Sequence, residues 1–259
     1  MKIAHEAPLS LMGEVQALTD YDYALVHLFE TKTDYLKFFE RALSKGRTVI
    51  LDNSIFELGT SFDPVRFAYW IEQLKPTEYI IPDVLESGEG TIRQLHHWMS
   101  NFKDLPGKKI GVVQGRTYED IKECYLEVNS YCDKIAISFD YSLYEKLYPH
   151  KNKIISWALG RVLLINMLIR DKILNFNKPH HLLGCSTPEE FKFYREYDFI
   201  ESVDTSNPVV HGLLGIKYPE SGLLQKDRIK LVNLLHAKPD VEAYEIIKYN
   251  ISKFKEIVG

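Results

Sequence analysis

The stretch Thr48-Val49-Ile50-Leu51-Asp52-Asn53 decides the fold expected for this chain, because it joins an unbroken apolar run to a polar end. The stretch Gly111-Val112-Val113-Gln114 has the same form. Strands of a parallel sheet carry such near-continuous apolar runs, since helices cover both of their faces. The two stretches therefore predict an α/β protein built on a parallel sheet.

Outward from these runs, strand-like and helix-like segments alternate along the chain. Helix signals include Asp63-Pro64, an N-cap followed by proline at the first helical position, and Thr187-Pro188-Glu189-Glu190, which adds a capping-box glutamate. Two amphipathic helices are expected after the last strand, at 225–236 and 241–257. The eight expected strands are 2–6, 23–29, 48–53, 79–84, 110–114, 134–139, 181–185 and 200–204.

Eight strands in this alternation predict a TIM-like (β/α)8 barrel in a single domain of residues 1–259. The barrel is expected over about 1–210, with a C-terminal helical extension at about 211–259 packed on it. A doubly wound open sheet is the alternative fold. Its G-x-G-x-x-G fingerprint is missing, since Gly88-Glu89-Gly90 supplies only two glycines.

Composition excludes several classes of protein. With 45% hydrophobic and 26% charged residues, the chain is neither disordered, collagenous nor a coiled coil. No apolar run approaches the roughly 18 residues that span a bilayer, and the N-terminal residues lack the apolar region of a signal peptide. No membrane partner is therefore expected.

Cysteine content bears on the cellular location of the protein, and net charge bears on its attraction to polyanions. Cys124, Cys132 and Cys185 form neither a disulfide framework nor a C-x-x-C motif, which predicts a reducing, cytoplasmic location. The net charge of −4 argues against bulk attraction to polyanions but leaves a local basic face open.

Carboxylates and amides follow the expected strands. Chemistry in such barrels lies at the carboxyl ends of the strands, where this chain has Asp52, Asp83, Gln114 and Asp204. This rim offers no lysine for a Schiff base and no histidine pair with metal-ligand spacing, so neither an aldolase nor a catalytic metal is expected. Each aspartate has an alternative role as a helix cap. His180-His181 is expected at the opposite end of the barrel, in a structural role.

The rim residues suit purine glycosyl chemistry. Of two facing carboxylates, one can attack an anomeric carbon while the other manages a proton. A further carboxylate beside an amide matches guanine, since the carboxylate accepts from N1–H and the exocyclic amine while the amide donates to O6. The rim therefore predicts a purine glycosyl site.

Four motifs in chain order extend this interpretation. The first two are Asp52-Asn53-Ser54-Ile55-Phe56-Glu57, similar to D-S-G-G-F-Q, and Gly111-Val112-Val113-Gln114-Gly115, similar to G-I-V-Q-G. The third is Leu182-Leu183-Gly184-Cys185-Ser186-Thr187-Pro188-Glu189, similar to L-M-G-V-G-T-P-E. The fourth is Asp204-Thr205-Ser206-Asn207-Pro208, which keeps the spacing D-x-x-x-P. With these motifs the chain resembles the tRNA-guanine transglycosylases and their phage DNA-modifying relatives, the DpdA group.

The resemblance implies a base exchange through a covalent glycosyl-enzyme. Asp204 would be the nucleophile and Asp52 the general acid/base. The partners implied are a nucleic acid, whose target guanine must leave its stack, and a free 7-deazaguanine base such as preQ0 or preQ1, with no cofactor. The implied substrate-binding residues are Asp83, Gln114, Gly115, Ser138, Phe139 and Phe56.

Departures from the family pattern bear on the substrate. No cysteine follows Cys185, so the family's C-x-C-x-x-C…H zinc site and its subdomain are expected to be absent. Ser54-Ile55 replaces a glycine pair, and Val209-Val210-His211 replaces basic residues. Because the zinc subdomain helps to shape tRNA binding and dimer contacts in the family, DNA is favoured over tRNA and the oligomeric state stays open.

Other functions remain open at this point. They are the same exchange on tRNA, a non-catalytic partner subunit that binds nucleic acid or base, and a free-nucleoside hydrolase or base-exchange enzyme. The position of the basic residues would discriminate among them, since a polynucleotide requires cations beside the rim. The candidates are Lys151, Lys153, Arg161, Arg170, Lys172, Lys217, Lys226, Arg228 and Lys230.

Overall fold

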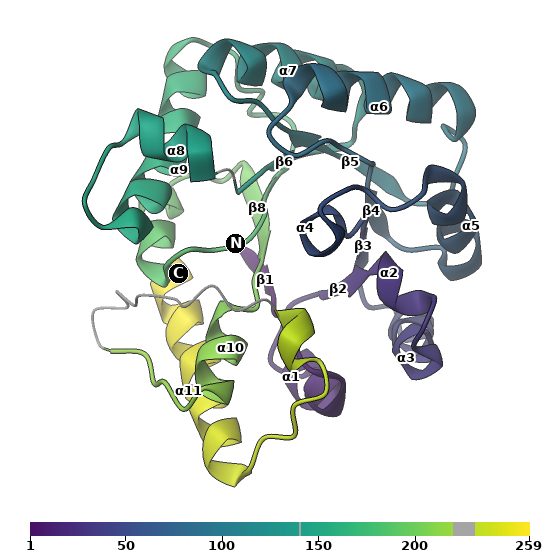
Figure 1. Ribbon diagram of the computed structural model, residues 1–259, viewed down its shortest axis with the longest axis vertical. Helices are drawn as coiled ribbons and strands as arrows, with labels where there is room; N and C mark the ends of the chain where they lie inside the picture. The colour runs from purple at the N-terminus through teal and green to yellow at the C-terminus, as the bar shows by residue number, and fades with distance from the viewer. Residues whose placement is uncertain (140, 220–230) are drawn as a thin grey trace.

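Eight parallel strands curve into a nearly closed barrel in the computed structural model, which describes residues 1–139, 141–219 and 231–259 (Figure 1). Neighbouring strands follow the order β1-β8-β7-β6-β5-β4-β3-β2. The predicted TIM-like α/β fold is confirmed. The strands are β1 (Lys2–Ala4), β2 (Asp22–Leu25), β3 (Val49–Asp52), β4 (Glu78–Ile80), β5 (Lys108–Val113), β6 (Lys134–Ile137), β7 (His180–Leu182) and β8 (Ile200–Asp204).

Helices surround the barrel (Figure 1). The α-helices are α1 (Met12–Gln16), α2 (Val26–Phe29), α3 (Thr33–Ser44), α4 (Ile55–Leu58), α5 (Pro64–Leu74), α6 (Gly88–Asn101), α7 (Tyr118–Tyr131), α8 (Tyr141–Leu147), α9 (Lys153–Arg170), α10 (Asn207–Leu213) and α11 (Val241–Val258). The described part of the chain also has the 3₁₀ helices η1 (Leu9–Leu11), η2 (Pro188–Tyr194) and η3 (Leu231–Leu234). The helix predicted at 241–257 is α11. Of the one predicted at 225–236, residues 225–230 lie outside the described residues, and η3 occupies part of the remainder.

Local sequence signals account for several element boundaries. The Asp63 side chain accepts from the Arg66 amide at 2.8 Å and starts α5, as predicted. The capping box predicted at Thr187 does not form, because the Glu190 carboxylate pairs with Arg161 instead. The strand predicted at 23–29 is wrong in its second half, where the chain forms α2.

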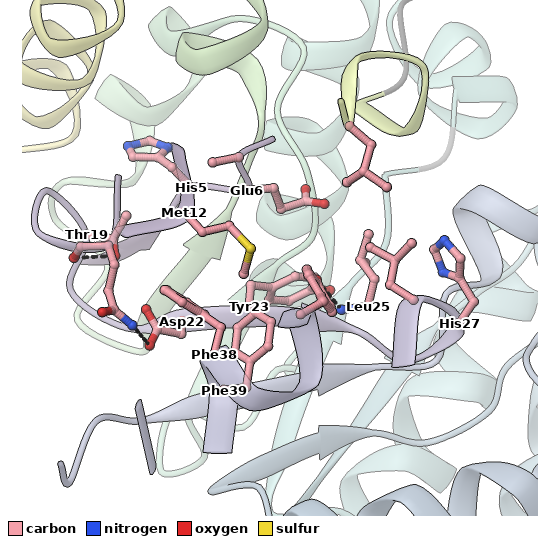
Figure 2. A pocket seen from close by; sticks show the side chains of 15 residues that line it. His5, Glu6, Met12, Thr19, Asp22, Tyr23, Leu25, His27, Phe38 and Phe39 are labelled. Atoms are coloured by element: carbon pink, nitrogen blue, oxygen red, sulfur yellow. Dashed lines mark hydrogen bonds between the residues drawn. The ribbon is translucent and has the colours of Figure 1, made fainter. Parts of the chain in front are cut away.

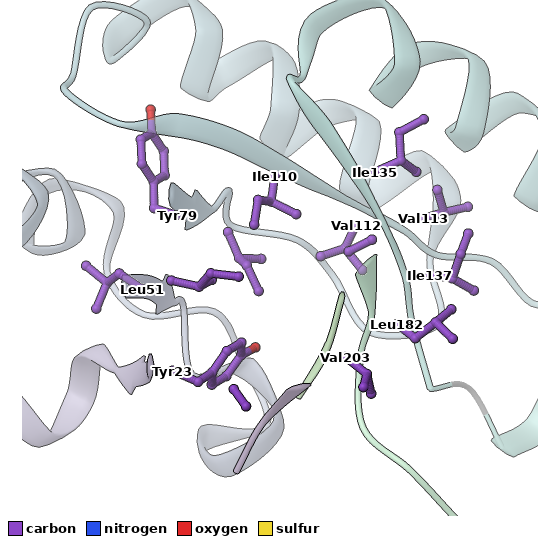
Figure 3. Close-up of a cluster of buried hydrophobic side chains, with 14 of the residues drawn as sticks. Tyr23, Leu51, Tyr79, Ile110, Val112, Val113, Ile135, Ile137, Leu182 and Val203 are labelled. Carbon is purple, nitrogen blue, oxygen red and sulfur yellow. The ribbon is translucent and has the colours of Figure 1, made fainter. Parts of the chain in front are cut away.

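Both faces of the central strands are buried, which explains their apolar runs. Val112 and Val113 point to opposite faces of β5, since side chains alternate along a strand, and each is 1% exposed. Figure 3 shows side chains from β5, β6, β7 and β8 gathered in this core. The apolar runs in the sequence therefore result from the burial of both faces of these strands.

The barrel has one seam, between β1 and β2, which are the two end strands of the sheet order. Asp20 bridges it: its backbone N–H donates to the Ile3 carbonyl at 2.9 Å, and its carboxylate accepts from the Ile3 amide at 2.8 Å. The Tyr21 hydroxyl donates to the Val203 carbonyl at 2.7 Å and ties the start of β2 to β8. These bonds hold the two edges together where strand pairing does not.

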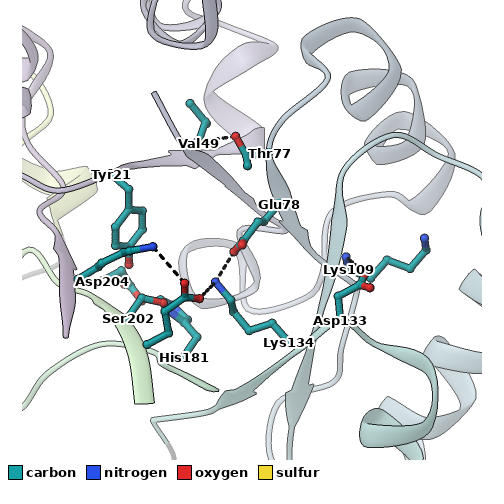
Figure 4. Close-up of polar contacts among 12 residues, drawn as sticks. Tyr21, Val49, Thr77, Glu78, Lys109, Asp133, Lys134, His181, Ser202 and Asp204 are labelled. Carbon is teal, nitrogen blue, oxygen red and sulfur yellow. Dashed lines mark hydrogen bonds and ion pairs between the residues drawn. The ribbon is translucent and has the colours of Figure 1, made fainter. Parts of the chain in front are cut away.

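A buried lysine closes the amino-terminal end of the barrel (Figure 4). Lys134 Nζ, at the start of β6, lies 2.5 Å from Glu78 Oε2 of β4 and 2.7 Å from Glu201 Oε2 of β8. Lys2 Nζ reaches the other oxygen of Glu201 at 3.1 Å, but its side chain is largely exposed. Charge pairing across three strands thus fixes this end, away from the rim.

We expect Lys134→Met to lower the free energy of unfolding by about 3–5 kcal/mol, because it leaves the Glu78 carboxylate buried without its cation. Lys2→Met is the matched control and should cost at most about 1 kcal/mol, since the pair it breaks is exposed. Urea unfolding of both variants measures the difference. Equal losses would contradict this account of the barrel end.

Candidate functional site

The structure brings the predicted polar residues to one end of the barrel. They follow four different strands: Asp52 ends β3, Asp83 and Gln114 follow β4 and β5, and Asp204 ends β8. All four are buried, at 7%, 2%, 3% and 6% exposure. Parallel strands produce this convergence, because their carboxyl ends meet at the same end of the barrel.

Asp83 is held by two side-chain amides. Its Oδ1 accepts from Asn53 Nδ2 at 2.8 Å, and its Oδ2 accepts from Gln114 Nε2 at 2.7 Å. Burial raises the pKa of Asp83, and these two hydrogen bonds offset part of that rise. The alternative role as a helix cap is wrong for Asp83, because Ser87 caps the following helix α6.

The Gln114 amide is oriented at both ends. While its nitrogen donates to Asp83, its Oε1 accepts from the Glu86 backbone N–H at 3.1 Å. An amide nitrogen carries two hydrogens, so a second donor remains on Gln114 beside the Asp83 carboxylate. The two residues form one preset unit of acceptor and donor.

Asp52 begins a tight turn into α4. Its Oδ2 accepts from the Ser54 amide at 2.9 Å, and Ser54 has φ +60°, in the left-handed region that glycine adopts most easily. Ser54 therefore keeps the backbone conformation that suits the glycine of the resembled motif. Its fully buried hydroxyl accepts from the His27 amide at 3.3 Å, which helps to hold this turn.

Burial raises the pKa of Asp52 well above its ordinary value, and the nearby charges of Glu57, Asp204 and Asp83 raise it further. A carboxyl group in this environment favours its protonated form. Asp52 is thus suited to donate a proton. Its hydrogen bond to the Ser54 amide also keeps it fixed at the end of β3.

Asp204 contacts a histidine that the sequence interpretation assigned to the wrong end of the barrel. His181 Nε2 lies 3.0 Å from Asp204 Oδ1, and His181 Nδ1 lies 2.9 Å from Ser202 Oγ (Figure 4). The error arose because β7 spans only His180–Leu182, so His181 lies in the middle of the strand and not at the start of a longer one. The pairing of β7 with β8 also has a register irregularity between His180 and His181. Side-chain alternation was the signal that could have found it: His181 pairs with Ser202, which shares a face with Asp204.

His180, by contrast, has the predicted structural role. Its Nε2 lies 2.9 Å from the Tyr125 hydroxyl and its Nδ1 lies 2.8 Å from the Lys178 carbonyl. Burial lowers the pKa of His180 to about 4, so the ring is neutral at physiological pH.

The other predicted substrate-binding residues have different surroundings. Gly115 leaves no space for a side chain, since a Cβ there would lie 2.7 Å from Asp120 Cβ at the start of α7. Ser138 is buried at the end of β6, and its carbonyl accepts from the Tyr144 hydroxyl. The centroid of the Phe139 ring lies 4.8 Å from the Arg161 guanidinium carbon, while Phe56 on α4 is 48% exposed.

Arg161, one of the candidate cations for a basic face, does not lie on the surface. This residue is fully buried, lies 2.5 Å from Glu190, and donates to the carbonyls of Leu183 and Gly184 at 2.7 and 3.0 Å. It is a structural cation that holds the turn after β7. Among the other candidates, Lys153 pairs with Glu145, Arg170 with Asp171, and Lys217 lies over the ring of Tyr249, while Lys151 and Lys172 are exposed. Lys226, Arg228 and Lys230 lie outside the described residues.

A small cavity of about 40 Å³ lies beside the β1–β2 seam (Figure 2). Its lining includes Glu6, Met12 and Tyr23. The Tyr23 ring also stacks on His181, with centroids 6.1 Å apart, and the charges of Asp204 and Asp52 add to the effect of burial in raising the Tyr23 pKa. The cavity has room for water but not for a purine.

Within residues 1–139, 141–219 and 231–259, no group of three or more histidine, cysteine, aspartate or glutamate side chains is arranged to hold a metal ion. No helix of this described part has the length and apolar character to cross a membrane.

Fold and site together define an α/β barrel with a buried cluster of aspartates, an amide and a histidine at its rim. No protein-family model matches the chain, and no curated protein matches it either. The resemblance to guanine transglycosylases therefore rests on the sequence motifs and on the chemistry of these residues.

The raised pKa of Asp52 gives a test by stability. A carboxyl whose pKa is higher in the folded state contributes stability at low pH that is lost as the pH rises through the folded pKa. Asp52→Asn stays neutral, so its stability relative to wild type should increase by up to about 1.4 kcal/mol per pH unit between the two pKa values. Urea unfolding from pH 4 to 8 measures this. The control is Asp198→Asn, at an exposed position, whose free energy of unfolding should depend on pH in the same way as that of wild type. The same pH dependence in Asp52→Asn would contradict a raised pKa of Asp52.

Proposed function

We propose that this protein is a guanine transglycosylase, which exchanges a guanine in DNA for a 7-deazaguanine such as preQ0 or preQ1. The observation that carries the proposal is the burial of Asp52, Asp83 and Asp204 at one rim, with Gln114 bonded to Asp83. These groups supply the nucleophile, the proton donor and the base-reading unit that such an exchange needs.

The proposed exchange has two displacement steps. In the first, an Asp204 oxygen forms a bond to C1′ as the bond from C1′ to the guanine nitrogen breaks, and the departing base takes the proton of Asp52. In the second, the incoming 7-deazaguanine gives a ring N–H proton to the Asp52 carboxylate and attacks C1′, which releases Asp204. The raised pKa of Asp52 supports this role, since a general acid must hold its proton near neutral pH.

Base recognition is assigned to Asp83 and Gln114. Each Asp83 oxygen accepts one hydrogen bond from a neighbouring amide, and a carboxylate has about four acceptor positions in total. It can therefore accept from guanine N1–H and the exocyclic amine while staying fixed. The second Nε2 hydrogen of Gln114 is the donor for guanine O6.

DNA is the favoured polynucleotide because residues 205–259 contain no cysteine, whereas the resembled tRNA enzymes have their zinc ligands after the nucleophile. The target guanine must be flipped out of its stack to reach buried carboxylates. The same exchange on tRNA is the alternative. A non-catalytic subunit is less well supported, because both carboxylates of the proposed reaction are retained.

The direct experiment offers the protein labelled guanine with duplex DNA, single-stranded DNA or tRNA, and measures label incorporated into each. Incorporation into DNA alone supports the proposal. Incorporation into tRNA alone would move the substrate to RNA, and no incorporation into any of the three would contradict the exchange activity itself.

For the nucleophile, we expect Asp204→Asn to abolish exchange and the covalent adduct, because an amide does not attack the anomeric carbon. The loss should lie in kcat, with the unfolding transition retained. Turnover within about tenfold of wild type would overturn the assignment of Asp204.

For base recognition, we expect Asp83→Ala to lower kcat/KM for guanine exchange by about 100-fold or more, because a charge-assisted pair with the base is lost. Gln114→Ala should cost less, since water can replace a neutral donor. Exchange kinetics of both variants give the comparison. Near wild-type efficiency of Asp83→Ala would place base recognition elsewhere.

A further inference from the structure

The two carboxylate oxygens of Asp204 have different surroundings. Oδ1 lies 3.0 Å from His181 Nε2 and accepts from the Gly184 backbone N–H at 3.4 Å. Among the described residues, no hydrogen bond reaches Oδ2. The carboxylate is thus held through one oxygen and leaves the other for a ligand.

His181 is fixed in the orientation that this contact needs. Its ring is fully buried, stacks on Tyr23, and has Ser202 Oγ 2.9 Å from Nδ1. An ionised carboxylate accepts hydrogen bonds only, so the Nε2 beside Asp204 must carry a hydrogen. The Ser202 hydroxyl can then donate to Nδ1, which selects the tautomer with its hydrogen on Nε2.

The second donor to Oδ1 is also held in place. The fully buried Arg161 donates to the carbonyls of Leu183 and Gly184, so it fixes the turn after β7. Gly184 has φ +63°, which a glycine adopts without strain. With its carbonyl bound to Arg161, Gly184 presents its N–H toward Asp204.

From these contacts we infer that His181 is a positioning residue that gives the Asp204 oxygens separate roles: Oδ1 is anchored, and Oδ2 attacks C1′. The role in catalysis rests on the proposed function, whereas the hydrogen bond does not. When the Oδ2–C1′ bond forms, Oδ1 becomes the carbonyl oxygen of the glycosyl ester. When that bond breaks, its electron pair returns to the carboxylate, and the negative charge on Oδ1 is stabilised by the donors from His181 and Gly184.

This charge distribution has a kinetic consequence. Without the His181 donor, the carboxylate is a poorer leaving group, so the second step slows and the covalent intermediate accumulates. A hydrogen bond to a charged group corresponds to about a 10- to 100-fold change in rate. A residue that merely supports the fold would lower turnover without raising the fraction of adduct.

His181→Phe removes the donor but keeps a ring that can stack on Tyr23. We expect it to lower kcat for exchange on a DNA oligonucleotide by about 10- to 100-fold, with KM for the oligonucleotide within about threefold of wild type. The fraction of enzyme carrying a covalent adduct, measured on denaturing gels, should rise. His181→Gln offers an amide donor in place of Nε2–H and should restore part of the rate and lower the adduct fraction.

His180→Gln is the matched control, because its ring bonds to Tyr125 and Lys178 and not to Asp204. It should leave the adduct fraction at the wild-type value. An unchanged adduct fraction in His181→Phe, or equal kcat and adduct values in His181→Phe and His181→Gln, would overturn the positioning role.

A measurement without substrate separates this inference from the proposed function. In nitrogen–proton NMR of the full chain, His181 should be in the Nε2–H form, and its signals should shift in Asp204→Asn. An Nδ1–H form, or His181 signals that do not shift in Asp204→Asn, would overturn the inference even if exchange is observed. If the wild type exchanges no base but shows the Nε2–H form sensitive to Asp204, the anchoring of Oδ1 stands and only the proposed activity fails.

Discussion

The parallel pairing of β8 with β7 places the His181 ring and the Gly184 backbone N–H beside Asp204. His181 pairs with Ser202, and Leu182 pairs with Val203, so the next residue of β8 extends beyond the end of β7. Asp204 consequently reaches both the His181 ring and the Gly184 backbone N–H. A shift of one residue in this register would turn the histidine to the other face of the sheet and leave Asp204 without that contact.

The two ends of the barrel handle buried charge in different ways. At the amino-terminal end, Lys134 balances Glu78 and Glu201 with a cation. At the rim, Asp83 is held by neutral amides, and Asp52 by a backbone N–H. Within the described residues, neutral donors fix these two carboxyl groups without a cation beside them. The amino-terminal end therefore balances its buried charge, whereas the rim keeps the carboxyl groups that the proposed exchange would use.

Local patterns in the sequence were sufficient for the barrel and for the rim aspartates. Buried strands leave apolar runs, and their carboxyl ends are marked by the polar residue that follows, as at Leu51-Asp52. Contacts between residues far apart in the sequence leave no such local pattern and could not be predicted. Leu25 donates its amide to the Tyr35 hydroxyl, and the strand predicted to continue there gives way to α2. Arg161 is a candidate rim cation in the sequence but is buried in the structure, because its partner Glu190 lies 29 residues away along the chain and no local pattern marks the pair.

The seam between β1 and β2 has a consequence for association between molecules. A closed barrel has no free strand edges, whereas an open edge can pair with a strand of another chain. Here Asp20 occupies the gap, with its amide and carboxylate bonded to Ile3 and its side chain 41% exposed. A strand added at this edge would have to displace those bonds and desolvate the carboxylate. The residue that completes the barrel thus also protects its edge from aggregation.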